Sequence, residues 1–247
     1  MDKNIRINPF DQLRVDPERS RRINAYLAHK GIASRREADA AISAGTVFIN
    51  GRRAKLGDRV SPSDKVEVRA KAKEKYYVAY HKPLGIVTHS PRENEQGIAD
   101  VFHFKATLSP MGRLDKDSHG LMILTNDGRV TARLLDAEEG REKEYFVRVD
   151  ETVRPGFLNK LSEGITLEGD VRTKPARATR MGEKSFSIVL TEGKRHEIRR
   201  MCATFGYRVL ELCRTRIMNI RLGTLKIGEG REFTPAERAK FLSALGL

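Results

Sequence analysis

A loop between two glycines combines carboxylates, cations and a histidine, and runs directly into an apolar stretch. Gly112 and Gly120 enclose the run Arg-Leu-Asp-Lys-Asp-Ser-His, and an apolar stretch that predicts a buried strand follows. A carboxylate in this loop, Asp115 or Asp117, can act as a nucleophile toward a sugar or a base, bind a metal, or stabilise a turn. Turn chemistry is the commonest role of an aspartate beside glycine, so the loop alone does not predict catalysis.

Two further segments carry side chains suited to an RNA nucleotide. Tyr145 stands at the start of a predicted strand, where its ring can stack on a base. A basic turn leads into a predicted helix at residues 195–205, and residues 194–221 hold 8 Lys or Arg against 2 acidic residues. A carboxylate facing the sugar, a ring facing the base and cations facing phosphates would together hold one nucleotide.

The cysteines and histidines do not predict a metal site. The 6 histidines and 2 cysteines show no spacing typical of zinc ligands, so we expect no metal. Cys202 and Cys213 are too few for a four-thiolate site, and we interpret them as semi-buried, reduced thiols.

The composition indicates a polyanionic partner. A formal net charge of +14 favours binding to a phosphate backbone, because such binding releases condensed counterions. Hydrophobic residues make up 39% of the chain, which is enough for a core and argues against disorder. No apolar stretch approaches the roughly 20 residues of a membrane span, and residues 1–13 show no secretory signal. We therefore expect a cytoplasmic protein that does not bind a membrane.

The elements that position these residues predict two domains. A capping box at Ser34 and the hairpin pair Asn50-Gly51 predict two helices followed by a small sheet in the first domain. We divide the chain into an N-terminal extension at 1–19, a small domain at 20–69, a linker at 70–75 and a large domain at 76–247.

The large domain is expected to be α+β, with a mixed, largely antiparallel sheet. Its strands predominate, are joined by short turns, and are accompanied by few helices. The first strand of the large domain is expected to be interrupted and then to resume at Ile86 and Val87. Two separate strands are expected at 207–212 and 217–222. A helix is predicted at 129–135 and another at 154–163.

The small domain resembles the S4 type of RNA-binding domain, named after a ribosomal protein. The runs Arg-Ile-Asn-x-Tyr-Leu, Ser-Arg-Arg-Glu-Ala and Val-Phe-Ile-Asn-Gly occur in that order within residues 21–69. Residues 1–72 also hold 16 Lys or Arg against 9 acidic residues. The resemblance implies that the helical arginines and the hairpin contact structured RNA. The residues expected to do so are Arg35, Arg36, Arg52 and Arg53.

The large domain resembles the pseudouridine synthases, and within them the branch that acts on ribosomal RNA. The resemblance extends from residue 21 to about residue 235. It rests on motifs that occur in family order: Lys82-Pro83-x-Gly85, Gly112-Arg113-Leu114-Asp115, Lys143-x-Tyr145 and Arg195-His196-x-Ile198-Arg199-Arg200-Met201. Residues 115–118, 200–202 and 214–219 look most like synthases of the large ribosomal subunit.

This resemblance implies a role for each matching residue. Asp115 resembles the catalytic aspartate, and Arg199 looks like the cation that pairs with it and keeps it ionised. Tyr145 resembles the residue that stacks on the target base. Arg113 looks like the residue that fills the space left by the extruded uridine. The cations Lys194, Arg195 and Arg200 are expected to contact RNA.

The implied reaction breaks the glycosidic bond, turns the uracil and rejoins it through a ring carbon, so no cofactor is expected. Glu197 stands where the family commonly carries glutamine, and we expect this to adjust local hydrogen bonds without changing the chemistry. Whether Asp115 attacks the sugar or removes a proton stays open, as does the identity of the target uridine. The expected partner is large-subunit ribosomal RNA, with a tRNA as a second substrate, and the protein is expected to be a monomer.

Two other functions compete with this one. The chain could be an RNA-binding or ribosome-assembly protein whose second domain is inactive. Other residues in place of Asp115, Tyr145 or Arg199 would favour that function, but all three are present. It could also be a nucleic-acid glycosidase that uses Asp115 and Asp117 as a carboxylate pair.

Overall fold

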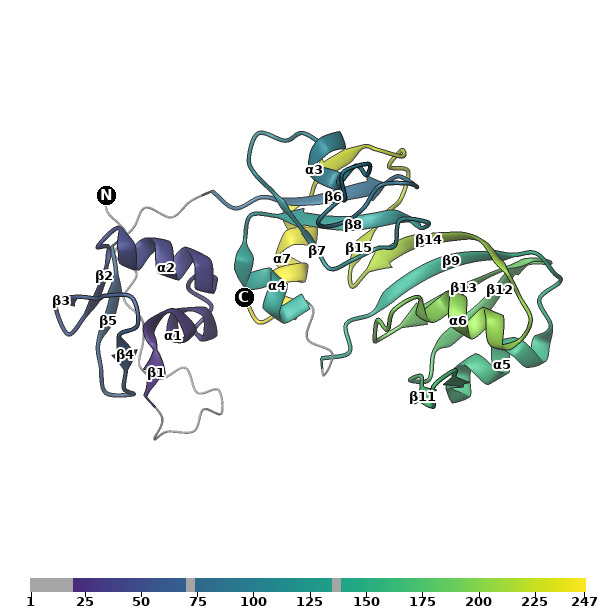
Figure 1. Ribbon diagram of the computed structural model, residues 1–247, viewed down its shortest axis with the longest axis horizontal. Helices are drawn as coiled ribbons and strands as arrows, with labels where there is room; N and C mark the ends of the chain where they lie inside the picture. The colour runs from purple at the N-terminus through teal and green to yellow at the C-terminus, as the bar shows by residue number, and fades with distance from the viewer. Residues whose placement is uncertain (1–19, 70–73, 135–138) are drawn as a thin grey trace. The chain divides into compact units, whose positions relative to one another are not determined.

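The computed structural model describes residues 20–69, 74–134 and 139–247, and the chain divides into two compact units (Figure 1). The first unit is Met1–Lys75 with Asp127–Arg129 and Leu247, and the second is Tyr76–Asn126 with Val130–Gly246. The expected extension at 1–19 and the expected linker up to residue 73 lie outside the described residues.

The first unit has two helices packed against small sheets. Its elements are β1 (Arg21–Arg22), α1 (Ile23–His29), α2 (Arg35–Ser43), β2 (Val47–Ile49), β3 (Arg52–Arg53), β4 (Arg59–Val60) and β5 (Val66–Val68). Strands β3, β2 and β5 form one antiparallel sheet, and β1 pairs with β4. Ile23, Leu27 and Ala38 from the helices pack with Val47 and Val66 in a core of this unit's own. The two helices and small sheet expected from the sequence are confirmed.

Local signals set the limits of α2 and of the hairpin. The Ser34 hydroxyl accepts the Glu37 amide at 3.2 Å, and the Glu37 carboxylate accepts the Ser34 amide at 2.8 Å. This reciprocal pair satisfies two amides that have no partner inside the helix. Asn50 and Gly51 both have positive φ between β2 and β3, as a two-residue hairpin turn requires.

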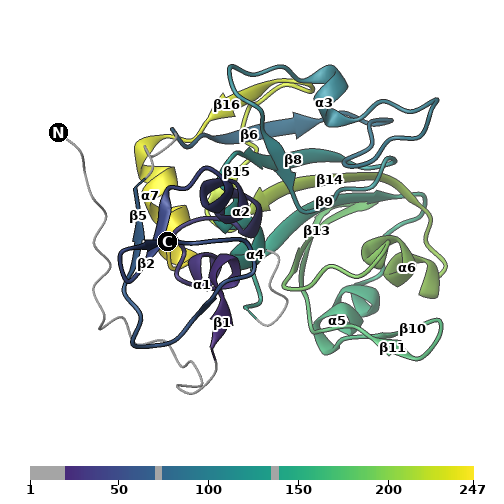
Figure 2. The same ribbon diagram turned by 60° about the vertical axis from the view of Figure 1, so that its left-hand side comes forward.

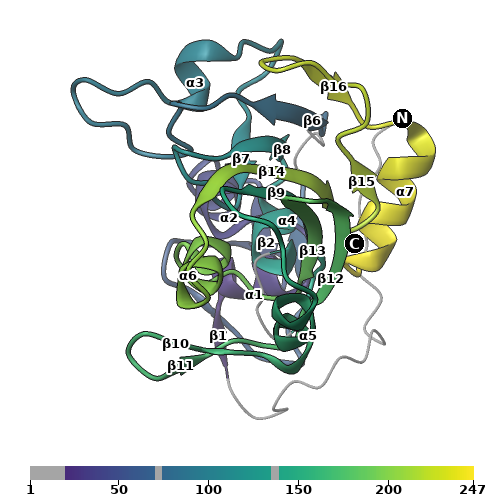
Figure 3. The same ribbon diagram turned by 90° about the vertical axis from the view of Figure 1, so that its right-hand side faces the viewer.

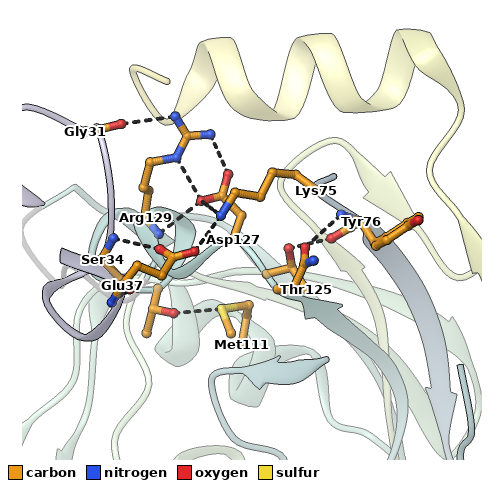
Figure 4. Close-up of polar contacts among 11 residues, drawn as sticks. Gly31, Ser34, Glu37, Lys75, Tyr76, Met111, Thr125, Asp127 and Arg129 are labelled. Atoms are coloured by element: carbon orange, nitrogen blue, oxygen red, sulfur yellow. Dashed lines mark hydrogen bonds and ion pairs between the residues drawn. The ribbon is translucent and has the colours of Figure 1, made fainter. Parts of the chain in front are cut away.

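A cluster of charged groups within the first unit includes the segment Asp127–Arg129 (Figure 4). The Arg129 guanidinium donates to the Asp127 carboxylate and, at 3.0 Å, to the Gly31 carbonyl. The Nζ of Lys75 lies 2.6 Å from Glu37 Oε1 and 4.0 Å from Asp127 Oδ1. The Asp127 side chain is fully buried, so these cations compensate the cost of removing its charge from water.

The second unit is built on one large mixed sheet. Its strands are β6 (Tyr77–Lys82), β7 (Ser109–Met111), β8 (His119–Thr125), β9 (Lys143–Val149), β12 (Arg177–Gly182), β13 (Ser185–Leu190), β14 (Val209–Ile217), β15 (Ile220–Arg221) and β16 (Gly230–Glu232). They run in the order β12-β13-β9-β14-β8-β6-β16, with β15 beside β14 and β7 beside β8. Within the described sheet, β14 and β8 are parallel and the other pairs are antiparallel. The α+β class and the largely antiparallel sheet are confirmed.

Helices cover the sheet unevenly. The helical elements are α3 (Ile98–Val101), α4 (Gly128–Leu134), α5 (Pro155–Glu163), α6 (Glu197–Thr204) and α7 (Pro235–Ala244), and a hairpin joins β10 (Thr166–Leu167) to β11 (Val171–Arg172). Helices α5 and α6 lie beside β9, β13 and β12 (Figure 3), where Phe157 and Met201 share an apolar core with Val147 and Phe186. At the other end β16 runs along the edge of β6 (Figure 2). None of the helices in the described ranges is long and apolar enough to cross a membrane.

Three details differ from the sequence expectations. The first strand does not resume after its interruption, because Val87 forms only an isolated bridge with Gly97. The two strands expected at 207–212 and 217–222 are one strand, β14, followed by a turn at Met218 and the short β15. Strand β14 continues through its charged residues because it pairs with β9 on one edge and β8 on the other. The predicted helix at 129–135 is α4, and residue 135 lies outside the described residues.

Candidate active site

A cavity of about 620 Å³ opens in the second unit between the loop at 112–120 and the turn that precedes α6. Five of its lining residues were predicted from the sequence as catalytic or RNA-binding residues: Arg113, Asp115, Tyr145, Lys194 and Arg195. These residues come from three separate segments of the chain, and the sheet brings them together. The volume lies within the range that suits a small ligand such as one nucleotide.

The backbone of the loop is fixed at every carbonyl from residue 113 to residue 118. The donors, in order, are Arg214 Nη1, Thr88 Oγ1, the Ser118 amide, the Gly85 amide, Arg199 Nη2 and Lys82 Nζ, at 2.5–3.1 Å. A loop held in this way keeps its side chains in place before a substrate arrives, which is the main structural requirement for orienting a reactive group.

Lys82 supports the loop from inside the sheet. Its side chain is fully buried, and its Nζ donates to the carbonyls of Pro83, Ile86 and Ser118 at 2.8, 2.7 and 2.9 Å. Each of the three N–H groups of the ammonium therefore has a carbonyl acceptor. Burial lowers the pKa of Lys82 to about 8, and the positive charge of Arg214 acts in the same direction.

Gly120 closes the loop where the backbone of β8 approaches β14. A Cβ at this position would lie 2.4 Å from the amide nitrogen of Arg214, and the φ of Gly120 is +113°. Both the contact and the dihedral angle demand glycine. The close approach also brings the buried Arg214 guanidinium to the carbonyls of Arg113 and Leu121.

The carboxylate of Asp115 lies beside a histidine and not beside the expected arginine. Its Oδ1 lies 3.6 Å from the Nε2 of His196, and both side chains are partly exposed, at 38% and 47%. His196 adopts a left-handed conformation, with φ of +49°, immediately before α6. Sequence reasoning gave His196 no role, although its place in the motif next to Arg195 was a usable signal.

The expected ion pair between Arg199 and Asp115 is not formed in the described chain. The Arg199 guanidinium donates instead to the carbonyl oxygens of Asp117 and Val209, with a longer contact to the Ser118 hydroxyl at 3.4 Å. The guanidinium fork therefore joins the loop at Asp117 to β14 at Val209. Arg200 does not line the cavity, and its guanidinium donates at 2.8 Å to the Glu168 carbonyl between β10 and β11, so its expected contact with RNA stays a prediction.

Glu197 is a buried carboxylic acid in the cavity wall. Its exposed fraction is 4%, its Oε2 accepts the Lys194 amide at 2.8 Å, and its Oε1 has no hydrogen-bond partner among the described residues. Burial raises the pKa of Glu197 to about 7, and the neighbouring Glu192 carboxylate raises it further. Glu197, where the resemblance led us to expect glutamine, thus places a carboxyl group with a raised pKa in the wall of the cavity that Asp115 also lines.

A second cavity, of about 580 Å³, lies in the first unit and is lined by Arg21, Arg22, Arg35 and Arg59. Only Arg35 of this set was nominated from the sequence, because the pairing of β1 with β4 that gathers the others is long-range. Arg36 and Arg53 are exposed but lie outside this cavity. Arg52 also lies outside it and pairs with Asp58 at 2.9 Å.

The chain is similar to known RNA-modifying enzymes along most of its length. The family model for RNA pseudouridylate synthase matches residues 76–204, and the model for the S4 domain matches residues 21–66. The dual-specificity RNA pseudouridine synthase RluF of Escherichia coli strain K12 is 41% identical over 227 residues, which cover 90% of this chain and 78% of RluF. The ribosomal large subunit pseudouridine synthase B of Bacillus subtilis is 34% identical over 238 residues, covering 91% of this chain and 96% of the relative.

A solved structure extends this similarity to the fold. A crystal structure of a pseudouridylate synthase superposes with a TM-score of 0.67 at 30% sequence identity, covering 89% of this chain and 99% of the other.

Proposed function

Because the chain belongs to the RNA pseudouridylate synthase family, we propose that it converts a specific uridine of large-subunit ribosomal RNA to pseudouridine, with Asp115 as the catalytic carboxylate. The observation that carries the proposal is the position of Asp115 at the cavity, on a loop whose carbonyls from residue 113 to residue 118 are all bound by donors. In the reaction the bond between the ribose and a ring nitrogen of uracil breaks, and that nitrogen takes up a proton. The ribose then bonds to carbon five of uracil, and the hydrogen on carbon five leaves as a proton.

Tyr145 supports binding of a flipped base. Its half-buried ring packs against two separate apolar clusters, one around Val147 and one around Tyr80, which fixes its orientation. A fixed ring at a cavity wall can stack on an extruded uracil at little entropic cost. Arg113 is exposed at the cavity, where its guanidinium can fill the space that the uridine leaves in the RNA. Lys194 and Arg195 line the cavity and are proposed to contact the flanking phosphates, although the Lys194 ammonium is paired with the Glu192 carboxylate in this structure.

The assay that tests this function is tritium release from ribosomal RNA labelled at carbon five of uracil, in single turnover. Asp115→Asn should abolish release while RNA affinity changes little, because phosphate contacts elsewhere dominate binding. Asp117→Asn is the matched control, since Asp117 is an exposed carboxylate in the same loop, and it should keep most of the activity.

Each competing function gives a distinct result in the same assay. Free uracil in the wild-type reaction would identify a glycosidase, and RNA binding with neither product would identify an RNA-binding protein. Product from Asp115→Asn at the wild-type rate would remove Asp115 from the mechanism.

We also propose that the arginine-lined cavity of the first unit anchors the RNA. Substituting both Arg22 and Arg35 by alanine should make the negative slope of log affinity against log salt shallower by about 1.5, since each phosphate contact contributes about 0.7–0.9 to its magnitude. Turnover at saturating RNA should stay unchanged. An unchanged slope would contradict this role.

Substrate range and assembly are further parts of the proposal. A tRNA is proposed as a second substrate because the relative RluF bears the name of a dual-specificity enzyme. We propose that the protein works as a monomer in the cytoplasm, where ribosomal RNA is available. Mapping pseudouridines in both RNA classes from a deletion strain, and light scattering of the purified protein, test these points.

A further inference from the structure

We propose that His81, His119 and Cys213 form a binding site for one Zn²⁺ ion in the second unit. One donor atom from each of these three side chains lies within 4.8 Å of the others. His81 and Cys213 are buried, and the His119 side chain is 12% exposed. Two imidazoles and a thiolate are a donor set that zinc accepts readily.

The sheet topology brings these residues to one face. Cys213 of β14 and His119 of β8 are cross-strand partners, and His81 of β6 pairs with Leu121, two residues along β8 from His119. Residues that pair across strands share a face, as do residues two apart on one strand. Lys82 and Arg214, which are the next residues after His81 and Cys213, point to the opposite face and hold the catalytic loop.

The contacts of the two histidines require one more ring N–H group than two neutral imidazoles carry. His81 Nδ1 lies 2.8 Å from the Leu225 carbonyl, His81 Nε2 lies 3.1 Å from His119 Nδ1, and His119 Nε2 lies 3.4 Å from the Glu211 carboxylate. The carbonyl and the carboxylate only accept, so each of the three contacts needs a ring hydrogen. Two neutral imidazoles carry only two. A cation bound between Nε2 of His81 and Nδ1 of His119 removes the deficit.

The outer contacts match those of a metal-binding histidine pair. Such histidines donate their second ring N–H to a backbone carbonyl or a carboxylate, which fixes the tautomer and directs the other nitrogen at the metal. Leu225 and Glu211 are these two acceptors, and Glu211 is held in turn by Arg148 at 3.1 Å.

The distances are compatible with tetrahedral zinc after a small adjustment. Usual bond lengths give about 3.3 Å between two bound nitrogens and about 3.6 Å between a nitrogen and a sulfur. The nitrogens of His81 and His119 are 3.1 Å apart. Loading would draw the Cys213 sulfur inward and release its proton to solvent. The fourth position is left for a water, which can enter beside the partly exposed His119.

The ion would be structural and would support the active site from the far face of the sheet. It ties β6, β8 and β14 together, and His119 follows directly after Ser118, the last loop residue whose carbonyl is held. This inference does not rest on the proposed function, because its measurement does not use RNA.

The test uses the full chain, reduced and freed of metal with a chelator, and titrated with Co²⁺ and then Zn²⁺. We expect one Co²⁺ per chain with a thiolate-to-cobalt charge-transfer band, and displacement of that band by Zn²⁺. Cys213→Ser should abolish the band. Cys202→Ser is the matched control and should retain it, because Cys202 is also a buried thiol but lies on α6, outside the cluster of the two histidines. A hundredfold excess of Zn²⁺ over its dissociation constant should raise the wild-type thermal midpoint by about 5 °C.

His119→Gln provides an independent variant if Cys213→Ser does not fold, since its position is partly exposed, and it should weaken Co²⁺ binding at least tenfold. The proposal is overturned if the wild-type protein gives no thiolate band. It is equally overturned if the band persists in Cys213→Ser, or if His119→Gln binds Co²⁺ as tightly as wild type.

Discussion

The ammonium nitrogen of Lys82 lies 2.9 Å from the carbonyl oxygen of Ser118, at the end of the loop that carries Asp115. The other two acceptors of Lys82 are also backbone carbonyls, so one buried cation holds β6, the turn after it and the Asp115 loop together. The Lys-Pro-x-Gly motif therefore serves the site without entering the cavity.

Replacing Lys82 by methionine should leave three buried carbonyls without their donor. We expect a loss of roughly 2–4 kcal/mol in the free energy of unfolding, measured with urea. We also expect an approximately hundredfold lower single-turnover rate at saturating RNA, because the loop shifts. Lys116→Met is the control, since Lys116 is an exposed lysine of the same loop that pairs with Glu95 at the surface. Equal losses in both variants would contradict a specific role for Lys82.

Arg199 should act by positioning the loop. Arg199→Ala is expected to lower the single-turnover rate roughly 10- to 100-fold at saturating RNA, since the Asp117 carbonyl loses its donor. Arg199→Lys should recover only part of the rate, because one ammonium cannot reproduce the guanidinium fork. Arg195→Ala, at the cavity surface, should instead weaken RNA binding with nearly normal turnover.

The pH dependence of Arg199→Ala distinguishes positioning from direct ion pairing. If Arg199 acts only through the loop backbone, the acid limb of the pH–rate profile stays where it is in the wild type. A shift of that limb to higher pH would favour the direct pair with Asp115 that the family resemblance implies.

Glu197 should make the protein less stable as pH rises toward neutrality. Its folded pKa of about 7 exceeds its ordinary value of 4.5, so the folded chain holds a proton that the unfolded chain has lost between these values. Stability therefore falls across that interval. Glu197→Gln removes this dependence and should be more stable than wild type at about pH 8, by on the order of 2–3 kcal/mol.

Urea unfolding at about pH 5 and about pH 8 measures this effect. Glu163→Gln is the control, because Glu163 is an exposed carboxylate on α5 whose substitution should change little at either pH. Glu192, Lys194 and Lys143 are the charged groups that act on the Glu197 carboxyl or respond to it. A wild-type protein equally stable at both pH values would refute the prediction.

Gly120→Ala should be strongly destabilising. The added Cβ would overlap the Arg214 backbone at a φ that disfavours side chains, and we expect a loss of roughly 3–5 kcal/mol in unfolding free energy. Gly156→Ala is a matched glycine substitution within α5, where a Cβ would meet no atom within 4 Å. It should stabilise the protein by about 0.5–1 kcal/mol. Similar stabilities for the two variants would contradict the proposed contact.

Local patterns in the sequence were sufficient for the turns and caps of the first unit and for the main helices. The capping box at Ser34 and the Asn50-Gly51 turn depend on neighbours within a few residues, so they could be read from the chain directly. The motifs around Asp115 and Tyr145 likewise predicted residues that line one cavity. Strand limits were less predictable at β14, because a charged stretch such as Arg214–Arg216 is stabilised by pairing on both edges.

The sequence by itself determined the α+β class, the family and five of the residues that line the cavity, since each is encoded in short runs of neighbouring residues. Only the tertiary structure decided what holds those residues in place. Lys82 reaches Ser118 across 36 positions, and Arg199 reaches Asp117 across 82. Spacing along the chain carries no information on such contacts, because they arise where strands distant in sequence pair. The same reason hid the cluster of His81, His119 and Cys213, whose members lie on three neighbouring strands.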